Sequence, residues 1–350
     1  MFIVYIIFLL FCIVITQSKG KNKEVFLMIA LIVLAFGAGW RDMRWPDTDV
    51  YSPAFTYFTN DLYSFSLSDI PFGYREYGFY FLGVIVKTFT NDAHIYLTFI
   101  AGLSLFFLYK DLRKYSIFPL IGLCAYIARF FIGRNLVQIR SGLAYLIVLW
   151  GIKYVQEKKL MKYLLVVWIA SWFHTSAWIA LPFYFFSNWV NINKKIVLIG
   201  LGVAFIIGGF FQGPISAFVT DNANDLNVVT YTQGIYVEQA KGLANPMIYF
   251  QCFLLLAYTY LEKRLKPITE YYRIIRDGYF YSTLILICFC SFTALSGRTS
   301  TMFATLEFSI IPSLIFLFNK KNLIVAYLVL SLALISIMYM NLPQWAIWSI

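Results

Sequence analysis

Apolar runs of about 15–20 residues recur from end to end of this chain and constrain its fold more than any other feature. Each run is about long enough to cross the hydrocarbon core of a bilayer as a helix. The runs are too long and continuous for barrel strands, and backbone groups inside a bilayer must bond to one another, so helices are expected. Hydrophobic residues form 61% of the 350 residues, which excludes a soluble domain of this size. The sequence predicts an all-α, polytopic integral membrane protein.

We expect a single polytopic membrane domain over residues 1–350, with about twelve transmembrane helices. The first run lacks a basic N-terminal region and a small-residue cleavage site, so we expect it to be kept as a span and not removed as a signal peptide. The segment 76–90 is apolar but short and carries Lys87, and a full crossing there would invert every later loop. We therefore expect a re-entrant or half-embedded helix at 76–90. The expected spans lie near 1–16, 25–40, 93–109, 116–132, 138–153, 160–173, 176–190, 196–211, 246–261, 279–296, 300–318 and 322–340.

Lysine is concentrated in short loops that alternate along the chain. Of the 17 lysines, 15 lie in six such loops, for example QSKGKNK and KYVQEKKLMK. The positive-inside rule makes these loops cytoplasmic and places both termini outside. The two longer loops, 40–75 and 212–245, then lie at the outer face, where chemistry is expected. Because topology explains the distribution of the net charge of +11, we expect no nucleic-acid partner.

Arginine is distributed differently from lysine. Of the 11 arginines, seven map to the outer side or the outer half of a span, where basic residues are disfavoured. A guanidinium keeps its charge and presents a planar fork that binds phosphate through two hydrogen bonds. Seven such groups beside a membrane indicate an anionic ligand of the diphosphate type; the alternative is snorkelling at the interface. They are Arg41, Arg44, Arg75, Arg129, Arg134, Arg140 and Arg298.

The first outer loop contains the stretch GWRDMRWPDTDVY, which combines aspartates, arginines and aromatic residues. Asp47 or Asp49 can act as a general base for a sugar hydroxyl, with Arg41 and Arg44 close enough to tune its pKa and hold a phosphate. Trp45 and Tyr51 are expected to stack on sugar rings. The two aspartates can also hold a divalent cation, but neither a metal nor another cofactor is expected. The alternative interpretation is a solvated loop with internal ion pairs.

Polar residues in or beside the apolar runs are further candidates, because a polar group in a bilayer usually faces a cavity. Arg134, Gln138 and Ser141 are spaced i, i+4, i+7 and so share one face of a helix. His174 lies between two runs on the expected outer side, where it can serve as acid, base or phosphate partner; a structural role is the alternative. Glu307 lies within a run. All five cysteines lie inside apolar runs, which favours buried thiols over disulfides or a metal site.

Five short motifs follow one another along the chain. They are Arg44 with Asp47-Thr48-Asp49-Val50-Tyr51; Glu76-Tyr77-Gly78-Phe79; Arg140-Ser141-Gly142-Leu143-Ala144; Phe173-His174-Thr175-Ser176-Ala177 with Leu181-Pro182; and Gly297-Arg298. In this order they resemble the EpsG-type family of polysaccharide polymerases, which is similar in role to the Wzy O-antigen polymerases. Tyr77 departs from the family pattern, which has proline there. The resemblance covers most of the chain, and the five motifs carry it only together.

The resemblance implies a glycosyltransferase of the bacterial inner membrane whose active site faces the periplasm. It would join oligosaccharide repeat units carried on undecaprenyl pyrophosphate, for an O-antigen, a capsule or an exopolysaccharide. A hydroxyl of the incoming unit would attack the anomeric carbon of the growing chain. Membrane lipid and a chain-length regulator protein are the other expected partners. The expected roles are pyrophosphate binding for Arg44, Arg75, Arg134, Arg140 and Arg298, general base for Asp47 or Asp49, and orientation of these groups for Glu76 and His174.

Three other functions share parts of this pattern. An O-antigen ligase would use the same donor with a different acceptor, but its larger outer loop with helices is not evident here. A flippase for lipid-linked oligosaccharides would need basic residues along a path through both leaflets, and the cytoplasmic halves of the expected spans lack them. A membrane acyltransferase would need a histidine on the cytoplasmic side. The sequence also lacks a P-loop and a GxGxxG motif, so an activated substrate must supply the energy.

Overall fold

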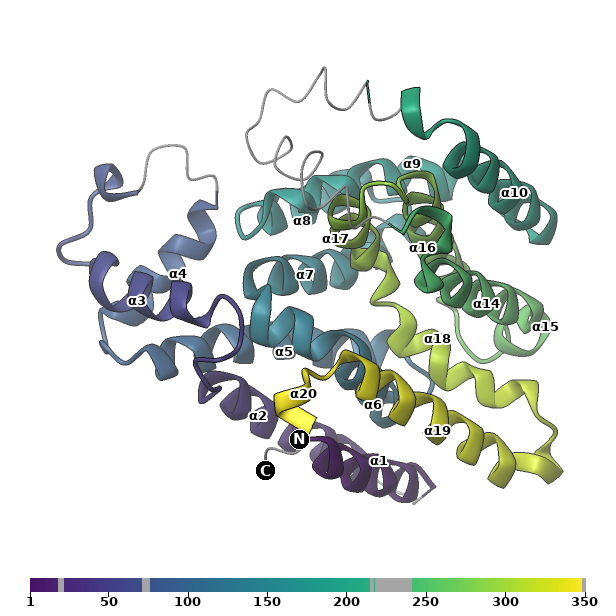
Figure 1. The fold of residues 1–350 in the computed structure, drawn as a ribbon, viewed down its shortest axis with the longest axis horizontal. Helices are drawn as coiled ribbons and strands as arrows, with labels where there is room; N and C mark the ends of the chain where they lie inside the picture. Colours follow the sequence, from purple (N-terminus) through teal and green to yellow (C-terminus); the bar gives the residue numbers. More distant parts are fainter. Residues whose placement is uncertain (18–21, 71–75, 215–216, 218–240, 348–350) are drawn as a thin grey trace. The chain divides into compact units, whose positions relative to one another are not determined.

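The computed structural model describes residues 1–17, 22–70, 76–214, 217 and 241–347, and within these ranges the chain is helical without strands (Figure 1). This confirms the predicted all-α class. The chain divides into two compact units. Unit 1 comprises Met1–Tyr154, Lys159–Leu181 and Glu307–Ile350, and unit 2 comprises Val155–Lys158 and Pro182–Leu306. That all of 1–350 forms a single membrane domain stays a prediction.

Most of the helices belong to unit 1. In chain order they are α1 Phe2–Gln17, α2 Asn22–Gly39, α3 Thr48–Phe58, η1 Leu67–Asp69, α4 Tyr77–Lys87, α5 Ala93–Tyr115, α6 Pro119–Tyr126, η2 Ile127–Val137, α7 Ile139–Gln156, α8 Leu160–Ser171, η3 Thr175–Ala180, α18 Glu307–Ser313, η5 Leu314–Leu317, η6 Lys320–Asn322, α19 Leu323–Asn341 and α20 Gln344–Ile347. The last two residues of α7 belong to unit 2. Unit 2 contains α9 Leu181–Trp189, α10 Lys194–Phe210, η4 Gly242–Ala244, α14 Pro246–Tyr260, α15 Glu262–Leu265, α16 Tyr272–Cys288 and α17 Thr293–Ala304.

Among the described residues, 4 helical segments are long and apolar enough to cross a membrane: α2, α5, α6 with η2, and α19. The bent pair Ser296–Ala304 and Glu307–Leu317 makes a fifth if it is counted as one span. These segments support a membrane protein, while the number of about twelve spans stays a prediction. The expected span 176–190 is divided into η3 and α9 at Leu181. Pro182 explains the division, because it lacks a backbone N–H and is tolerated only in the first turn of a helix.

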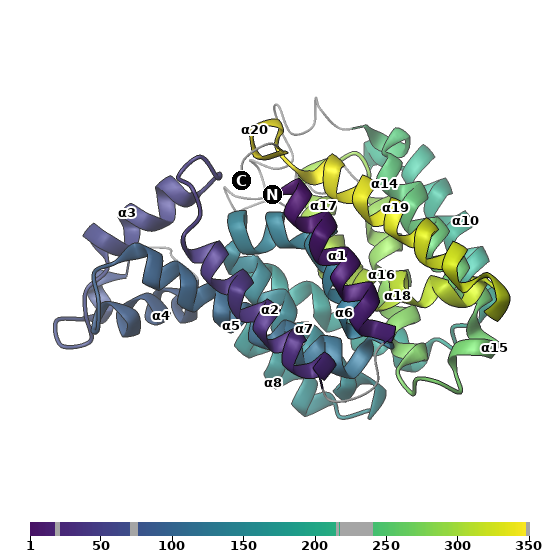
Figure 2. The ribbon, with the colours of Figure 1, turned by 90° about the horizontal axis from the view of Figure 1, so that it is seen from below.

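Small residues allow the helices of unit 1 to pack closely. A Cβ on Gly39, at the end of α2, would overlap the side chain of Thr98 in α5. Gly122 of α6 faces the carbonyl of Phe308 in α18, and Ser116 donates a hydrogen bond to the same carbonyl over 3.2 Å. Figure 2 shows α1 beside α6 and α19. Close backbone approach at small residues is the usual way in which membrane helices associate.

The helices α3 and α4 pack against α5 (Figure 1). Tyr51 and Phe55 of α3, Phe79 of α4 and Tyr96 of α5 belong to one buried cluster, in which the Phe55 and Tyr96 rings stack 4.4 Å apart. The Lys87 amine donates to carbonyl groups near the end of α3 at 2.6 and 3.1 Å, which satisfies acceptors that a helix end leaves free. With 11 residues, α4 is about 16 Å long. This length suits the half-embedded helix expected at 76–90, whose position in a membrane stays a prediction.

The helix α6 continues into η2, a π-helix of 11 residues. Such wide turns are rare and occur frequently at functional sites. The π-helix ends where the N–H of Gln138 donates to the carbonyl of Gly133 over 2.9 Å, and α7 begins directly afterwards. Arg134 donates to Gln138 Oε1 at 2.6 Å and to Ser141 Oγ at 2.8 Å. The three side chains contact one another, but the prediction that they share one face of a single helix is wrong, because Arg134 lies in the π-helix, Ser141 in α7 and Gln138 between the two.

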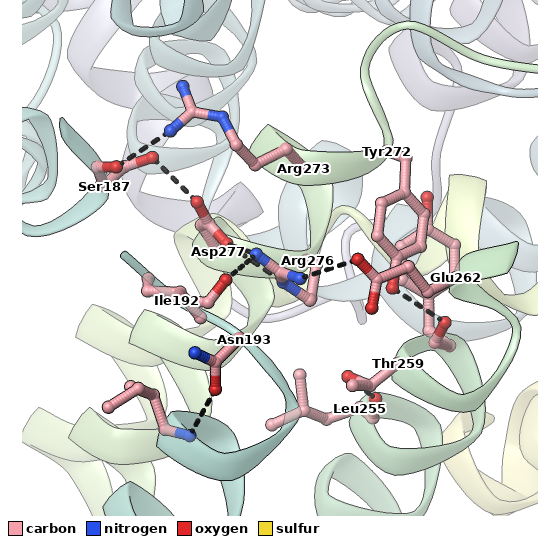
Figure 3. Close-up of polar contacts among 12 residues, drawn as sticks. Ser187, Ile192, Asn193, Leu255, Thr259, Glu262, Tyr272, Arg273, Arg276 and Asp277 are labelled. Atoms are coloured by element: carbon pink, nitrogen blue, oxygen red, sulfur yellow. Dashed lines mark hydrogen bonds and ion pairs between the residues drawn. The ribbon is translucent and has the colours of Figure 1, made fainter. Parts of the chain in front are cut away.

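Unit 2 is arranged around α16, which packs against α10, α14 and α17. A buried polar cluster lies near the start of α16 (Figure 3). Arg276, only 3% exposed, donates to Oδ1 of Asp277 at 2.9 and 3.1 Å and to the carbonyl of Ile192 at 2.6 Å. Ser187 donates to the other oxygen of Asp277 at 3.0 Å. Both carboxylate oxygens and the guanidinium are therefore engaged, as a buried ion pair requires.

Candidate active site

Three polar side chains from separate parts of unit 1 meet at the start of α4. Glu76, directly before α4, forms an ion pair with Arg140 of α7. The other carboxylate oxygen of Glu76 lies 3.7 Å from Nε2 of His174, which follows α8. The side chain of Glu76 is 9% exposed and that of Arg140 is 35% exposed, so the guanidinium is the more accessible partner. The structure thus brings together three of the predicted site residues.

Burial and pairing act in opposite directions on the acidity of Glu76. Burial raises the pKa of the Glu76 carboxyl above its ordinary value, and Arg140 and the backbone N–H of Thr175 oppose this shift by stabilising the carboxylate. In its ionised form, a carboxylate whose pKa is raised is a stronger base than an exposed one.

The corner between α8 and η3 determines where α4 begins. The carbonyl of Trp172 accepts hydrogen bonds from the N–H groups of Gly78 at 2.9 Å and Phe79 at 3.3 Å. These bonds satisfy two of the N–H groups that the first turn of α4 leaves free. A Cβ on Gly78 would lie 2.8 Å from the Cβ of Trp172, so only glycine permits this approach. Glycine in the Glu-Tyr-Gly-Phe motif therefore lets Glu76 reach His174.

Replacing Gly78 by alanine is expected to destabilise the protein by about 1–3 kcal/mol, because the added methyl group overlaps Trp172 and pushes α4 away from the corner. The matched control is Gly102→Ala in α5, where nothing lies within 4 Å of an added Cβ. Alanine favours a helix over glycine, so the control should be neutral or stabilising. Thermal unfolding of the detergent-purified protein compares the two variants. Equal melting temperatures would contradict the close approach at Gly78.

The hydrogen bonds at Nδ1 of His174 indicate which ring nitrogen carries the proton. The backbone N–H of Ser176 donates to Nδ1 over 3.2 Å, and Ser176 Oγ lies 2.6 Å from the same atom. Because Nδ1 accepts, Nε2 of the neutral ring carries the proton and directs it toward Glu76. The Tyr145 hydroxyl lies 2.8 Å from Ser176 Oγ, and the Arg134 guanidinium lies 4.6 Å from the centre of the Tyr145 ring. A chain of polar contacts thus links Arg134 to Glu76.

Arg140 also contacts α3. Its Nε donates to the hydroxyl of Tyr51 over 3.3 Å, and Tyr51 is 8% exposed. Tyr51 therefore presents its hydroxyl to the arginine while its ring is packed in the core, so the structure shows it as a partner of Arg140. The expected stacking of Tyr51 on a sugar ring stays a prediction.

In the described part of the chain, the aspartates expected to act as bases form no ion pair with this cluster. Asp47 and Asp49 are exposed at the start of α3, and Asp47 has a left-handed backbone with φ of 65°. Across the described part of the chain, no group of three or more His, Cys, Asp or Glu side chains is arranged to hold a metal ion. All five cysteines are free thiols.

Arg44 and Trp45 both contact the C-terminal segment of unit 1. Arg44 is paired with Asp42 at 2.7 Å, and this hydrogen bonding holds the pKa of the Asp42 carboxyl below its usual value. The Arg44 guanidinium lies 4.5 Å from the centre of the Trp345 ring. Trp45 is only 4% exposed and packs edge-on against Trp345 at 4.8 Å. Its expected role in sugar binding also stays a prediction.

Two further predicted pyrophosphate ligands lie outside the described residues of unit 1. Arg75 lies outside the described residues. Arg298 lies on α17 in unit 2 and is partly buried. Their roles stay predictions.

The sequence did not identify Tyr145 and Ser176 as site residues. Ser176 belongs to the Phe-His-Thr-Ser-Ala motif, and that motif is the signal that could have identified it. Tyr145 is one of 26 tyrosines and carries no such signal. For Arg41 the sequence predicted that it tunes a neighbouring aspartate and holds a phosphate, but its burial cannot be read from a loop sequence.

The fold and the site define an all-helical membrane protein in which a buried glutamate is held between an arginine and a histidine. The chain belongs to the EpsG family, whose model matches residues 24–347, and the predicted resemblance is thereby confirmed. It is also similar to the amylovoran biosynthesis protein AmsC of Erwinia amylovora, with 23% identity over 313 residues, 83% of this chain and 79% of the relative. No solved structure matches the chain.

Proposed function

We propose that this protein is a polysaccharide polymerase that joins undecaprenyl-pyrophosphate-linked repeat units by glycosyl transfer. The observation that carries the proposal is the cluster of Arg140, Glu76 and His174, which combines a phosphate-binding group with a carboxylate held near it. Membership of the EpsG family and similarity to an amylovoran biosynthesis protein support a role in exopolysaccharide biosynthesis. The apolar helices suit a substrate that is anchored in the bilayer by its lipid.

The ion pair between Glu76 and Arg140 suggests how substrate binding prepares the reaction. The pyrophosphate of the donor competes with Glu76 for the accessible Arg140, because guanidinium binds phosphate oxygens through two hydrogen bonds. Glu76 is then released to accept a proton. Its other neighbour, His174, keeps the carboxylate oriented through the Nε2 proton.

The proposed transfer step is balanced as follows. A hydroxyl oxygen of the incoming repeat unit forms a bond to the anomeric carbon of the growing chain, and its proton passes to Glu76. The bond between the anomeric carbon and the phosphate oxygen breaks, and its electron pair leaves with undecaprenyl pyrophosphate. Arg140 stabilises the charge that develops on the leaving group. Glu76 takes the role first expected for Asp47 or Asp49, because it is buried and anchored while they are exposed.

The remaining predicted residues have supporting roles in this proposal. Arg134, linked to the cluster through Tyr145, assists in pyrophosphate binding, and the same role is proposed for Arg44, Arg75 and Arg298. Asp47 and Asp49, which are exposed, contact the sugar. The sugar contacts proposed for Trp45 and Tyr51 rest on their aromatic side chains alone. No metal or other cofactor is required.

We place the protein in the bacterial inner membrane with about twelve spans, lysine-rich loops inside and the cluster facing the periplasm. The substrates are the lipid-linked donor and acceptor, and a chain-length regulator is the proposed protein partner. This orientation suits a reaction that uses no ATP.

The test is elongation by the purified full-length protein, supplied only with lipid-linked repeat units and analysed as a ladder on a gel. Longer chains are expected without added nucleotide or metal. A flippase would give no elongation in detergent, and a ligase would leave single units unjoined until its own acceptor was added. Either of those two outcomes would refute the polymerase proposal.

A further inference from the structure

Arg41 is a buried cation that lacks a counter-ion among the described residues. It follows α2 and is 5% exposed. Its Nε donates to Thr48 Oγ1 at 2.8 Å, and its Nη1 lies 3.4 Å from the carbonyl oxygens of Ala38 and Asn135. Its third nitrogen, Nη2, is buried without an acceptor. In the described part of the chain, no carboxylate lies within ion-pair distance of it.

The same chain contains a buried arginine with a complete set of partners, which makes the gap at Arg41 informative. Arg276 is 3% exposed, close to the value for Arg41, yet it has Asp277, the Ile192 carbonyl and, at 3.9 Å, Glu262 around it (Figure 3). A buried charge without a partner costs several kcal/mol, so a purely structural arginine is expected to be paired as Arg276 is. The arrangement at Arg41 is therefore that of a cation awaiting an external anion.

A second donor without an acceptor belongs to a residue that Arg41 contacts. Asn135, on the π-helix, is 2% exposed, and its Nδ2 has no hydrogen-bond partner. Its Oδ1 accepts a hydrogen bond from the Tyr126 hydroxyl over 2.7 Å, so in this side-chain orientation the amide nitrogen is the atom without a partner. A charged and a neutral N–H donor on neighbouring residues are the groups that recognise an oxyanion.

The position of Arg41 relates it to the cluster at Glu76. Arg41 donates to Thr48, three residues before Tyr51 in α3, and Tyr51 accepts a hydrogen bond from Arg140. Burial lowers the pKa of the Arg41 guanidinium to about 10, which leaves it a cation at neutral pH, and the carboxylate of Asp47 opposes this shift. Arg41 and Arg140 therefore both contact the first turn of α3, and of the two only Arg140 has a carboxylate within ion-pair distance.

We infer that Arg41 Nη2 and Asn135 Nδ2 bind a phosphate or diphosphate oxygen, forming a second anion site beside Arg140. The assignment of this anion to the lipid-linked donor rests on the proposed function. In that setting the diphosphate bridges the two arginines: one phosphate binds Arg41 and Asn135, and the other displaces Glu76 from Arg140.

The test is binding of inorganic diphosphate to the full-length protein in a phosphate-free maltoside detergent, measured by titration calorimetry. Arg41→Gln is expected to weaken binding about 10- to 100-fold, the loss typical of a charge-assisted hydrogen bond. Arg113→Gln is the control. Arg113 is exposed at the end of α5 and pairs with Glu24 at the start of α2, whereas Arg41 follows the end of α2. The control variant should bind as the wild type does. Equal affinities for wild type and Arg41→Gln would overturn the inference.

A second variant keeps the test decisive if Arg41→Gln fails to fold. Asn135→Asp places a carboxylate on the residue that Arg41 already contacts, so it supplies the missing counter-ion. The inference expects the variant to melt at or above the wild-type temperature and to lose diphosphate binding about 10- to 100-fold. Unchanged binding by a stable Asn135→Asp protein would also overturn it.

Competition separates the sources of the phosphate. Displacement of the diphosphate by a water-soluble prenyl diphosphate, but not by short-chain phosphatidylglycerol, is expected and assigns the site to the donor. Displacement by both supports the anion site and assigns it to a phospholipid headgroup as well. If the wild type fails to elongate chains while its diphosphate binding depends on Arg41, the proposed function is wrong and the anion site stands. If chains elongate but the affinity for diphosphate does not depend on Arg41, the proposed function stands and the anion site at Arg41 is wrong.

Discussion

Replacing Glu76 by glutamine is expected to lower the turnover number for chain elongation about 100- to 10,000-fold, the usual contribution of a general base. Glutamine has the same shape but cannot take up the proton of the acceptor hydroxyl. It also leaves Arg140 without its carboxylate, so the KM for the lipid-linked donor should stay constant or fall. The measurement is the initial rate of elongation by purified protein over a range of donor concentrations.

The matched control is Glu24→Gln, since Glu24 is a half-exposed carboxylate that pairs with Arg113. It should elongate chains at the wild-type rate. Arg140→Gln should also reduce elongation, with a raised KM for the donor. In the double variant the loss of transition-state stabilisation should not exceed the sum of the two single losses, because residues in one ion pair act as a unit. A Glu76→Gln enzyme that turns over within a few-fold of wild type would show that Glu76 is only structural.

Replacing Arg276 by methionine is expected to destabilise the protein by about 3–5 kcal/mol, because the buried carboxylate of Asp277 loses its cation. Asp277 is 1% exposed and has no route to water that could compensate. The double variant Arg276→Met with Asp277→Leu removes both charges and should recover most of this loss. Unfolding of the detergent-purified protein by added dodecyl sulfate measures all three proteins.

Arg273→Gln serves as the control for that series. Arg273 lies on the same helix, and the structure gives its Nη1 a single hydrogen bond, to the Ser187 carbonyl at 3.0 Å (Figure 3). Its loss should cost about 1 kcal/mol. If Arg276→Met were as stable as the control, or if the double variant were as unstable as the single one, the buried ion pair would not be what stabilises this part of unit 2.

The helical class was readable from the sequence because it depends on local properties. The length of an apolar run and its lack of turn residues decide between helix and strand in a membrane. Element boundaries were harder to predict. The run 176–190 was expected to be one helix, and the 3-10 turn η3 interrupts it before α9. Nor did the spacing of Arg134, Gln138 and Ser141 reveal that a π-helix precedes α7, because polar spacing alone does not distinguish the two helix types.

The candidate site was predictable residue by residue but not as a set. Arg140 and His174 stood out because charged or polar groups beside apolar runs are costly and are seldom present without a role, whereas Glu76 was indicated only by its motif in the family resemblance. Their mutual contacts depend on how α4, α7 and the corner after α8 pack, and no spacing rule connects segments so far apart in the chain. The close approach at Gly78 is the physical reason that these segments meet where they do.

By itself the sequence determined the helical membrane class, the family and the separation of most arginines from the lysine-rich loops along the chain, since each depends on composition and local order. Only the tertiary structure decided which arginine does what. Arg41 and Arg44 are three positions apart in one loop, yet Arg44 is exposed and paired with Asp42 while Arg41 is buried beside Asn135. The difference arises from a contact between residues 94 positions apart in the sequence. Burial and pairing of charges are set by such long-range contacts, whose free energies are not encoded in any short segment.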